Sequence, residues 1–138
     1  MDPLSDVLAL LKPQSYRTAG LNAGGAWSIR FENRTGTIKC YAVTDGACWL
    51  KVDDLDDKVR LVAGDCFMLP SGRSFTLASD LTIPPTAAYD VLGRARHGSV
   101  VVHNGGGDTM CRGRTKTRPR PRHLQSHSTD RLQLRVLR

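Results

Sequence analysis

The stretch Gly64-Asp-Cys-Phe-Met-Leu-Pro-Ser-Gly72 places a short apolar run between two turn signals. Gly64 suits a turn because glycine tolerates a positive φ. The apolar run Cys66–Leu69 is short enough to predict a buried strand rather than a helix. Pro70 fixes its own φ and, with Gly72, favours a second turn that sends the next strand back across the sheet. The segment therefore predicts a turn, a strand and a turn in succession.

Similar short runs with turn residues between them lie on both sides of this segment. Regular spacing of such runs is typical of an all-β sandwich or barrel and disfavours alternating β and α units. Asp45-Gly46 separates two of the runs and predicts a hairpin there. The predicted strands are Tyr16–Thr18, Trp27–Phe31, Ile38–Val43, Ala47–Val52, Val59–Val62, Cys66–Leu69, Ser74–Leu77 and Ser99–His103.

Helical patterns occur in two places. Asp2-Pro3 and the apolar residues that follow at helical spacing predict a short N-terminal helix that ends before Pro13. A second short helix is predicted within Ala87–Ala95, crossing one end of the sandwich. After the turn at 104–108 we expect no further strand, because most of residues 109–138 follows neither strand nor helix periodicity. Its composition predicts a disordered basic tail.

The basic charge of the protein belongs to that tail. The formal net charge is +7, but residues 1–108 carry 11 Lys and Arg against 12 Asp and Glu, whereas residues 109–138 carry 9 against 1. Basic side chains of this kind contact phosphates with a steep salt dependence. The tail has no aromatic residue to stack on bases, so such binding would be non-specific. The residues concerned are Arg112, Arg114, Lys116, Arg118, Arg120 and Arg122.

The length of 138 residues is typical of one domain. No apolar run approaches the length of a membrane span, and the N-terminus lacks the features of a secretory signal. We therefore expect a soluble, cytoplasmic protein without membrane contact. In such a protein thiols stay reduced, and Cys40, Cys48 and Cys66 lie in apolar runs where cysteine behaves as a small buried hydrophobe.

The segment Gly64–Gly72 matches G-x5-P-x-G, the second motif of cupins. With Trp27–Phe31, Cys40–Leu50 and Asn104–Asp108, the order of segments over residues 1–108 resembles the N-terminal cupin, or AraC-binding-like, domain of bacterial AraC-family transcription regulators. The resemblance implies a cupin-type β-sandwich or jelly-roll barrel that senses an unidentified small effector and takes part in a homodimer. In that family a separate domain with two helix-turn-helix units binds DNA. This chain shows no such pair of helices, so any link to DNA is indirect.

Many cupins are metalloenzymes, and the resemblance locates their ligand positions in this chain. The two histidines of the first motif correspond to Tyr41 and Val43, and the histidine of the second corresponds to Phe75. Glu32 is the only glutamate, so the acidic ligand of the first motif is missing too. Because phenol, phenyl and isopropyl groups are not the imidazole and carboxylate ligands such sites use, we predict no metal and no cofactor. No catalytic motif is present either, so we predict that the protein is not an enzyme.

The interior of the barrel is the remaining candidate site. By strand alternation Tyr41 and Val43 share one face, and the motif alignment aims Tyr41 and Phe75 at the position of the metal in the enzymes. These side chains either fill the core or line an apolar pocket for the effector. Trp27, Trp49 and Arg30 are the candidate rim residues. Arg30 would suit a carboxylate or phenolate, although an exposed arginine on a strand is commoner.

The sequence therefore predicts an effector-sensing and dimerisation domain of an AraC-family regulator without its own DNA-binding domain. The alternatives are a free-standing, metal-free cupin that binds a small molecule, and non-specific nucleic-acid binding through the tail. Residues 109–138 are either a frameshifted end of a regulator gene or a functional basic arm. If strands are missing after Asp108, the sandwich has an unpaired edge, which predicts marginal stability or association.

Overall fold

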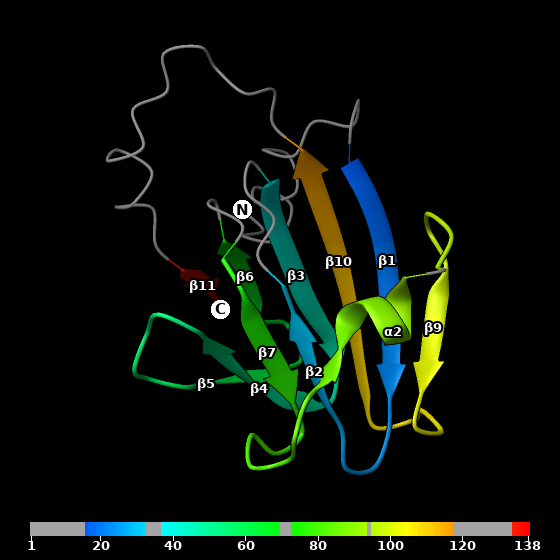
Figure 1. Ribbon diagram of the computed structural model, residues 1–138, viewed down its shortest axis with the longest axis horizontal. Coiled ribbons are helices and arrows are strands. Elements are labelled where there is room, and N and C mark those ends of the chain that lie inside the picture. The colour runs from blue at the N-terminus through cyan, green and yellow to red at the C-terminus, as the bar shows by residue number, and fades with distance from the viewer. Residues whose placement is uncertain (1–15, 33–36, 70–72, 94, 118–133) are drawn as a thin grey trace.

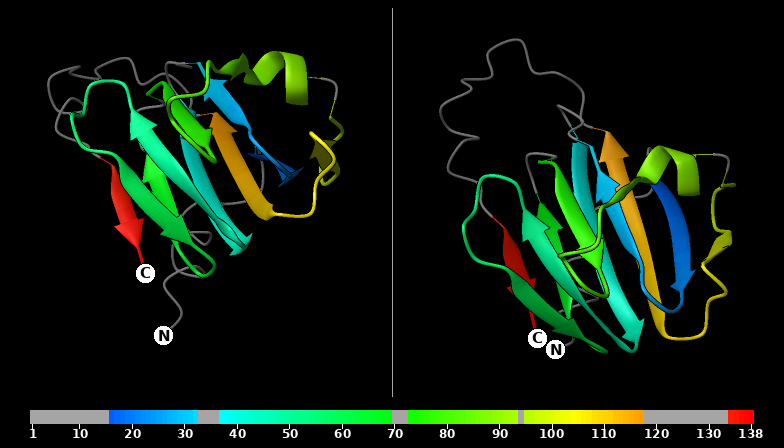
Figure 2. Two further views of the ribbon diagram at one scale, coloured as in Figure 1. Left: turned by 90° about the horizontal axis from the view of Figure 1, so that it is seen from below. Right: turned by 60° about the horizontal axis from the view of Figure 1, so that its bottom comes forward.

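The computed structural model describes residues 16–32, 37–69, 73–93, 95–117 and 134–138. These residues form two β-sheets stacked face to face, with one short helix at one end (Figures 1 and 2). The all-β sandwich predicted from the sequence is thus confirmed. No helix in this described part is long and apolar enough to cross a membrane.

The large sheet has six strands, and its centre is formed by segments distant in the sequence. The strand β10 runs antiparallel to β1 on one side and to β3 on the other. The strand β9 pairs with β1 in parallel, and β11 pairs with β6. In spatial order the strands are β11 (Arg135–Leu137), β6 (Cys66–Leu69), β3 (Thr37–Asp45), β10 (Thr109–Thr117), β1 (Tyr16–Ala23) and β9 (Val100–His103).

The small sheet has five strands and packs over one face of the large sheet. The strand β7 lies at its centre, antiparallel to β2 and β4. In spatial order the strands are β5 (Val59–Val62), β4 (Ala47–Val52), β7 (Phe75–Ala78), β2 (Ser28–Phe31) and β8 (Thr86–Ala87). The chain then enters the helix α2 (Ala88–Leu92).

The main core lies between the sheets and follows the period-two alternation of the strands. In β4, Cys48, Leu50 and Val52 are buried, whereas the residues between them are half-buried on the outer face. In the segment that begins at Gly64, this glycine has φ +98°, and Phe67 and Leu69 enter this core. A smaller cluster of Ile38, Cys40, Ala42 and Cys66 lies on the opposite face of the large sheet, together with Met68 and Leu137.

The predicted strands agree with the structure at most boundaries. Those at 47–52, 59–62 and 66–69 are confirmed residue for residue. The other predicted strands are present, and the one expected at 16–18 extends to Ala23. The helix expected within 87–95 is present but covers only Ala88–Leu92, with Gly93 as its C-cap. The predicted N-terminal helix and the turn at 70–72 lie outside the described residues.

The hairpin predicted at Asp45-Gly46 is wrong. Gly46 does form a turn with φ +74°, but the two strands that it joins lie in different sheets. On its way between sheets the chain passes close to the start of β10, where the Thr109 hydroxyl donates to the Ala47 carbonyl at 2.9 Å. β3 already pairs with β6 and β10, and β4 with β5 and β7, so neither has an edge free for the other.

The prediction that no strand follows Asp108 is also wrong. Residues 109–117 form β10, at the centre of the large sheet, and residues 135–137 form β11 at its edge. The strand β10 was not predicted because its inward positions, Cys111, Gly113 and Thr115, are small or polar and so show no apolar alternation. The unpaired edge was expected because no strand was predicted after Asp108, so that reason for it no longer applies. The division of the chain at residue 108 stays a prediction. Residues 118–133 lie outside the described residues.

Candidate functional site

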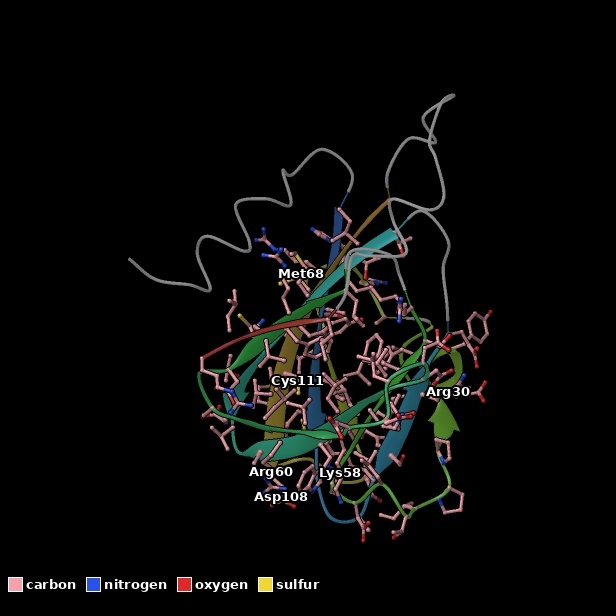
Figure 3. All side chains as sticks on the ribbon, turned by 90° about the vertical axis from the view of Figure 1, so that its left-hand side faces the viewer. Arg30, Lys58, Arg60, Met68, Asp108 and Cys111 are labelled. Carbon is pink, nitrogen blue, oxygen red and sulfur yellow. The ribbon has the colours of Figure 1, made fainter. Side chains whose placement is uncertain are left out.

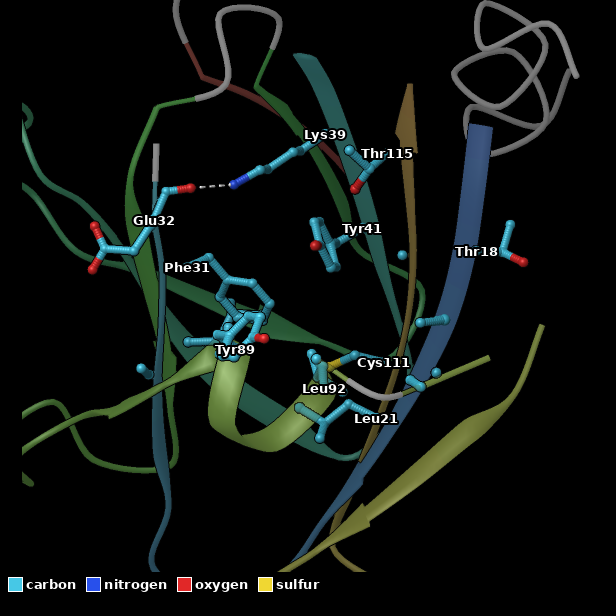
Figure 4. Close-up of a pocket in the computed structure, with 18 residues that line it drawn as sticks. Thr18, Leu21, Phe31, Glu32, Lys39, Tyr41, Tyr89, Leu92, Cys111 and Thr115 are labelled. Atoms are coloured by element: carbon cyan, nitrogen blue, oxygen red, sulfur yellow. Dashed lines mark hydrogen bonds between the residues drawn. The ribbon is translucent and has the colours of Figure 1, made fainter. Parts of the chain in front are cut away.

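A cavity of about 340 Å³ lies between the two sheets. Its floor is the inner face of β1, β3 and β10, and its opposite wall is the end of β2 with one residue of β7 (Figure 4). The helix α2 follows the edge strand β8 of the small sheet and contacts β9 at the edge of the large sheet, so it covers one side. The lining residues are Thr18, Ala19, Gly20, Leu21, Phe31, Glu32, Lys39, Tyr41, Leu77, Ala87, Ala88, Tyr89, Leu92, Gly93, Ala95, Cys111, Gly113 and Thr115.

An aromatic cluster forms one wall of the cavity. The ring of Phe31 stacks on Phe75 with centroids 4.6 Å apart, and Tyr41 meets Phe31 and Phe75 edge to face at 5.4 and 5.5 Å. Phe67 completes the cluster, 5.5 Å from Tyr41. Edge-to-face and stacked pairs of this kind are favourable and fix the rings in place. The wall is therefore rigid, and Phe31 and Tyr41 are the two of its rings that reach the cavity.

Lys39 is the buried cation of the cavity. It lies on the inward face of β3, two residues before Tyr41, with only 4% of its surface exposed. Its Nζ donates to the backbone carbonyl of Glu32 at 2.8 Å and lies 5.2 Å from the ring centroid of Phe75. Both contacts stabilise an ammonium in an apolar setting. The cavity thus has a positively charged end.

Arg30 lies on the outer face of the small sheet and does not line the cavity. Its guanidinium makes two hydrogen bonds to the carboxylate of Asp53, at 2.8 and 2.6 Å, and a third to Glu32 at 3.3 Å. This bidentate pair lowers the pKa of Asp53 below its usual value, and the same hydrogen bonds raise the pKa of Arg30. The arginine expected at the rim is thus engaged in a surface ion pair.

The other predicted pocket residues lie in different places, some at the cavity or in the core and one on the surface. Tyr41 lines the cavity, and Val43 and Phe75 are buried in the core beside it. Trp27 is buried in the same core, and its Nε1 has no hydrogen-bond partner among the described residues. Trp49 lies on the outer face of β4, where Lys58 and Arg60 cover its ring at 4.7 and 5.1 Å from the centroid.

The cysteines are all free and buried, as predicted for Cys40, Cys48 and Cys66. Burial raises the pKa of the Cys40 thiol to about 12. Cys111 of β10 lines the cavity and hydrogen-bonds Cys48 of the opposite sheet, and this bond together with burial raises the pKa of the Cys111 thiol. Figure 3 shows Cys111 in the interior, away from the surface residues Lys58 and Arg60. The raised pKa makes the thiols of Cys40 and Cys111 poor nucleophiles.

The positions of the cupin metal ligands do not fit a metal here. Val43 and Phe75 are core side chains, and Tyr41 packs within the aromatic cluster. His97 accepts a hydrogen bond from the Thr18 backbone N–H at 3.1 Å, and His103 ends β9. Within the described ranges, no three His, Cys, Asp or Glu side chains are grouped as metal ligands.

Several residues of the site were not found from the sequence. Lys39, Cys111, Gly113 and Thr115 line the cavity, as does the α2 residue Leu92. Alternation from Tyr41 would have placed Lys39 on the inward face, so that signal was present. The residues of β10 gave no signal, since their strand was not predicted.

Of the basic residues assigned to the tail, some belong to β10 and the others lie outside the described residues. Arg112 and Arg114 belong to β10 and lie on the outer face of the large sheet, opposite in register to Ala42 and Cys40 of β3. Lys116 also belongs to β10. Arg118, Arg120 and Arg122 lie outside the described residues.

Comparison with known proteins assigns the fold to a family. Residues 2–127 match the family model described as Cupin. The chain belongs to the cupin family. The match continues past Asp108 and through β10.

Two curated relatives of this cupin are described as AraC-like transcription regulators. The protein from Streptomyces antibioticus is 46% identical and that from Streptomyces lividans 44% identical, each over 110 residues. Each alignment covers 80% of this cupin and 35% of the relative, so the chain spans about a third of the length of these relatives. This agrees with the resemblance read from the sequence.

Solved structures with a similar arrangement were also found. ToxT from Vibrio cholerae matches with a TM-score of 0.46 and 10% identity, over 75% of this cupin and 31% of that chain. A cupin protein from Bacteroides fragilis matches with a TM-score of 0.41 and 11% identity, over 80% of this cupin and 71% of that chain.

Proposed function

We propose that this cupin is the effector-sensing domain of an AraC-like transcription regulator and that the effector is a small molecule bound in the central cavity. The observation that carries the proposal is the cavity of about 340 Å³, with rigid aromatic and aliphatic walls and a few polar groups. Binding sites for small molecules have this character. The curated relatives support the regulatory role, since both are described as transcription regulators.

In this proposal the cupin binds a ligand rather than catalysing a reaction, and acts in the cytoplasm. The helix α2 is the element through which occupancy would be sensed, because it lines the cavity and contacts strands of both sheets. A ligand that packs against Leu92 and Tyr89 would favour one position of α2 over others. In this proposal no contact with DNA is assigned to the described residues of the cupin.

The first experiment blocks the cavity. The purified chain is screened against a metabolite library by its thermal shift, and each hit is measured by calorimetry. Leu92→Trp places a larger side chain in the cavity and should weaken binding of a true cavity ligand by about tenfold or more. Asp90→Trp is the matched control, because Asp90 is exposed on the same helix and does not line the cavity. Equal affinity for both variants would place the ligand elsewhere and contradict the proposal.

A second experiment tests the regulatory role itself. The matching 110-residue segment of the Streptomyces antibioticus relative is replaced by this cupin, and transcription from a promoter of that regulator is measured. We expect transcription to change when the cavity ligand is added, and the change to be lost with Leu92→Trp. A chimera that binds both ligand and DNA without any response would favour the free-standing, metal-free cupin instead.

Self-association is a further part of the proposed role. The edge strand β9 exposes Val102 by 61% and Val100 by 41%, and these are two of the four large apolar side chains that are exposed among the described residues. Exposed apolar edge strands are frequent sites of strand pairing between chains. We propose a homodimer through β9, which sedimentation should detect and which Val102→Lys should dissociate. A monomer at all concentrations would contradict it.

A further inference from the structure

Two cysteines of the core face each other across the sandwich. Cys48 lies on β4 of the small sheet with 0% of its surface exposed, and Cys111 lies on β10 of the large sheet with 3% exposed. Neither forms a disulfide, and the two thiols hydrogen-bond to each other. Two sulfur atoms from distant parts of the sequence therefore meet at one point of an apolar core.

The path of the chain between the sheets explains why these two side chains meet. The Thr109 hydroxyl donates to the carbonyl of Ala47 at 2.9 Å, which holds the start of β10 against the start of β4. Cys48 follows Ala47 directly, and Cys111 comes two residues after Thr109. Stacked sheets are otherwise about 10 Å apart. The contact at Thr109 thus brings the strands together where each carries its cysteine.

The pair is reached from the cavity. Cys111 belongs to the cavity lining together with Leu21 and Leu92 (Figure 4). Within the part of the chain that the structure describes, no third His, Cys, Asp or Glu joins the two thiols in a group of metal ligands. A small solute in the cavity therefore meets one sulfur directly, with a second sulfur behind it and no further ligand of these types.

The number and kind of donor atoms select among metal ions. Zn(II) in proteins takes four ligands, or three with a water molecule, and Ca(II) and Mg(II) take oxygen ligands. Thiolates are soft ligands and favour Cu(I) among the metals of the first transition row. Monovalent d10 ions such as Cu(I) and Ag(I) also accept two ligands in a line. Two thiols without a third donor fit this class of ion.

The separation of the sulfur atoms favours a bridging ion over a disulfide. The sulfur atoms of a disulfide lie about 2.05 Å apart. Two thiolates on opposite sides of one metal ion lie about 4.5 Å apart, twice a metal–sulfur bond of about 2.3 Å. Non-bonded atoms in contact lie about 3.5 to 4.0 Å apart, which is nearer to the second separation. A bridging ion therefore requires less movement of the two sheets.

The surroundings of the pair also accommodate a negative charge. The hydrogen bond from the Cys111 thiol and the positive charge of Arg60 both lower the pKa of Cys48, against the effect of burial. One monovalent cation between two thiolates leaves a single negative charge on the complex. The same two groups that favour the Cys48 thiolate would therefore offset part of that charge.

We propose that Cys48 and Cys111 bind one monovalent soft d10 ion, of the Cu(I) or Ag(I) type, in a line between the two sheets. Binding forms two metal–sulfur bonds and releases the two thiol protons to water, and neither metal nor sulfur changes its oxidation state. Neither cysteine occupies one of the three histidine positions of the cupin motifs. The site does not depend on the proposed binding of an organic effector.

The test measures retention of Cu(I) by the purified, reduced chain in the absence of oxygen. Cu(I) is titrated in the presence of bicinchoninate, a chelator that withdraws the ion from single thiols. We expect one Cu(I) to be retained per chain, Ag(I) to displace it one for one, and Zn(II) not to be retained. X-ray absorption should show two sulfur neighbours and no nitrogen or oxygen neighbour. The melting temperature should rise, because the ion binds the folded chain.

Three substitutions assign the ion to this pair. Cys48→Ala and Cys111→Ala each leave a single thiol. Loss of a group that only orients a metal ligand already costs about 10 to 100 times in affinity, so loss of a ligand should cost about 100 times or more. Cys40→Ala is the matched control, because Cys40 is equally buried but lies in the cluster on the other face of the large sheet. Circular dichroism and a thermal melt establish that each variant is folded.

Several results would overturn the proposal. They are a wild-type chain that retains no Cu(I), equal retention of Zn(II), and an affinity that Cys40→Ala lowers as much as Cys48→Ala. If hydrogen peroxide joins Cys48 to Cys111 in a disulfide and the reduced chain retains no Cu(I), the pair is a redox pair instead. The stoichiometry and the X-ray absorption of the wild-type chain decide the question even if the variants do not fold. The effect of Leu92→Trp on organic ligands tests the proposed function separately.

Discussion

The ring of Tyr41 lies directly over the backbone of Gly113 on the neighbouring strand, in the space that a side chain at 113 would occupy. A Cβ there would overlap ring atoms of Tyr41. Glycine is therefore required at 113 because the ring needs the space, and the ring in turn forms part of the cavity wall.

This relationship predicts that Gly113→Ala destabilises the protein by about 1 to 3 kcal/mol, the usual effect of overpacking a core. The ring of Tyr41 has to move into the cavity, so ligand affinity should fall as well. Urea unfolding gives the first quantity and calorimetry the second. If Gly113→Ala is equally destabilising when Tyr41 is replaced by Ala, the contact between ring and backbone is not the cause.

The turn at Gly46 predicts a second effect on stability. Gly46 has φ +74°, and a Cβ there would overlap the backbone carbonyl oxygen of Asp108. Gly64 also has a positive φ, at +98°, but a Cβ there would meet open space.

Gly64→Ala should therefore cost about 1 to 2 kcal/mol from the backbone conformation alone. Gly46→Ala should cost clearly more, because backbone at the entrance of β10 also has to shift. Denaturant unfolding of the two variants compares them directly. Equal losses would mean that the approach of Gly46 to Asp108 contributes nothing.

The ion pair of Arg30 with Asp53 predicts a small dependence of stability on pH. Because Arg30 lowers the pKa of Asp53 in the folded protein, the pair stabilises the fold above the ordinary aspartate pKa of about 3.9. That stabilisation is lost as the pH falls through the lowered pKa of Asp53. With 37% of the Asp53 side chain exposed, solvent screening keeps the contribution below about 1 kcal/mol.

Unfolding free energies at pH 7 and pH 3 test this contribution. Asp53→Asn should reduce the difference between the two pH values slightly. Asp56→Asn serves as the control, since Asp56 is exposed in the same loop and no described ion pair involves it. An unchanged difference for Asp53→Asn would show that the pair has no net effect.

The buried thiols predict low reactivity and a loss of stability in alkali. The native protein holds the Cys40 proton up to a pH of about 12, whereas the unfolded chain releases it near pH 9. The free energy of unfolding should therefore decline as the pH rises above 9.

At pH 8 a disulfide reagent should label almost no thiol in the native protein and all 4 cysteines after denaturation. Asp56→Cys provides an exposed thiol in the same protein and should react at once. Rapid labelling of the native wild-type chain would contradict the burial of the thiols.

Strands were predicted correctly where the local hydrophobic pattern and turn residues agree with the pairing of strands in the sheets. The strands at 47–52, 59–62 and 66–69 alternate or are wholly apolar, and each is bounded by turn residues, so their limits were correct. Which strands pair with one another was harder to predict from the sequence. Asp45-Gly46 carries a hairpin signal, yet the flanking strands find partners distant in the sequence, which local turn chemistry does not encode.

The candidate site was predicted only in part, for a related reason. Tyr41 was placed correctly by alternation and by the motif, but Arg30 and Trp49 point to the outer face of the small sheet. Three cavity residues lie on β10, whose basic composition indicated a tail. A strand buried between two others gains its stability from backbone pairing, so its side chains need not be apolar where they line a cavity or face outward.

The place of β10 between β1 and β3 has a consequence for the order of folding. As the chain leaves the ribosome, β1 and β3 have no contact with each other through this sheet until residues 109–117 follow, more than 60 residues after β3 has ended. The large sheet therefore closes last. Since such distant pairing raises the entropic barrier to folding, we expect the slow step to be the insertion of the strand that completes the cavity floor.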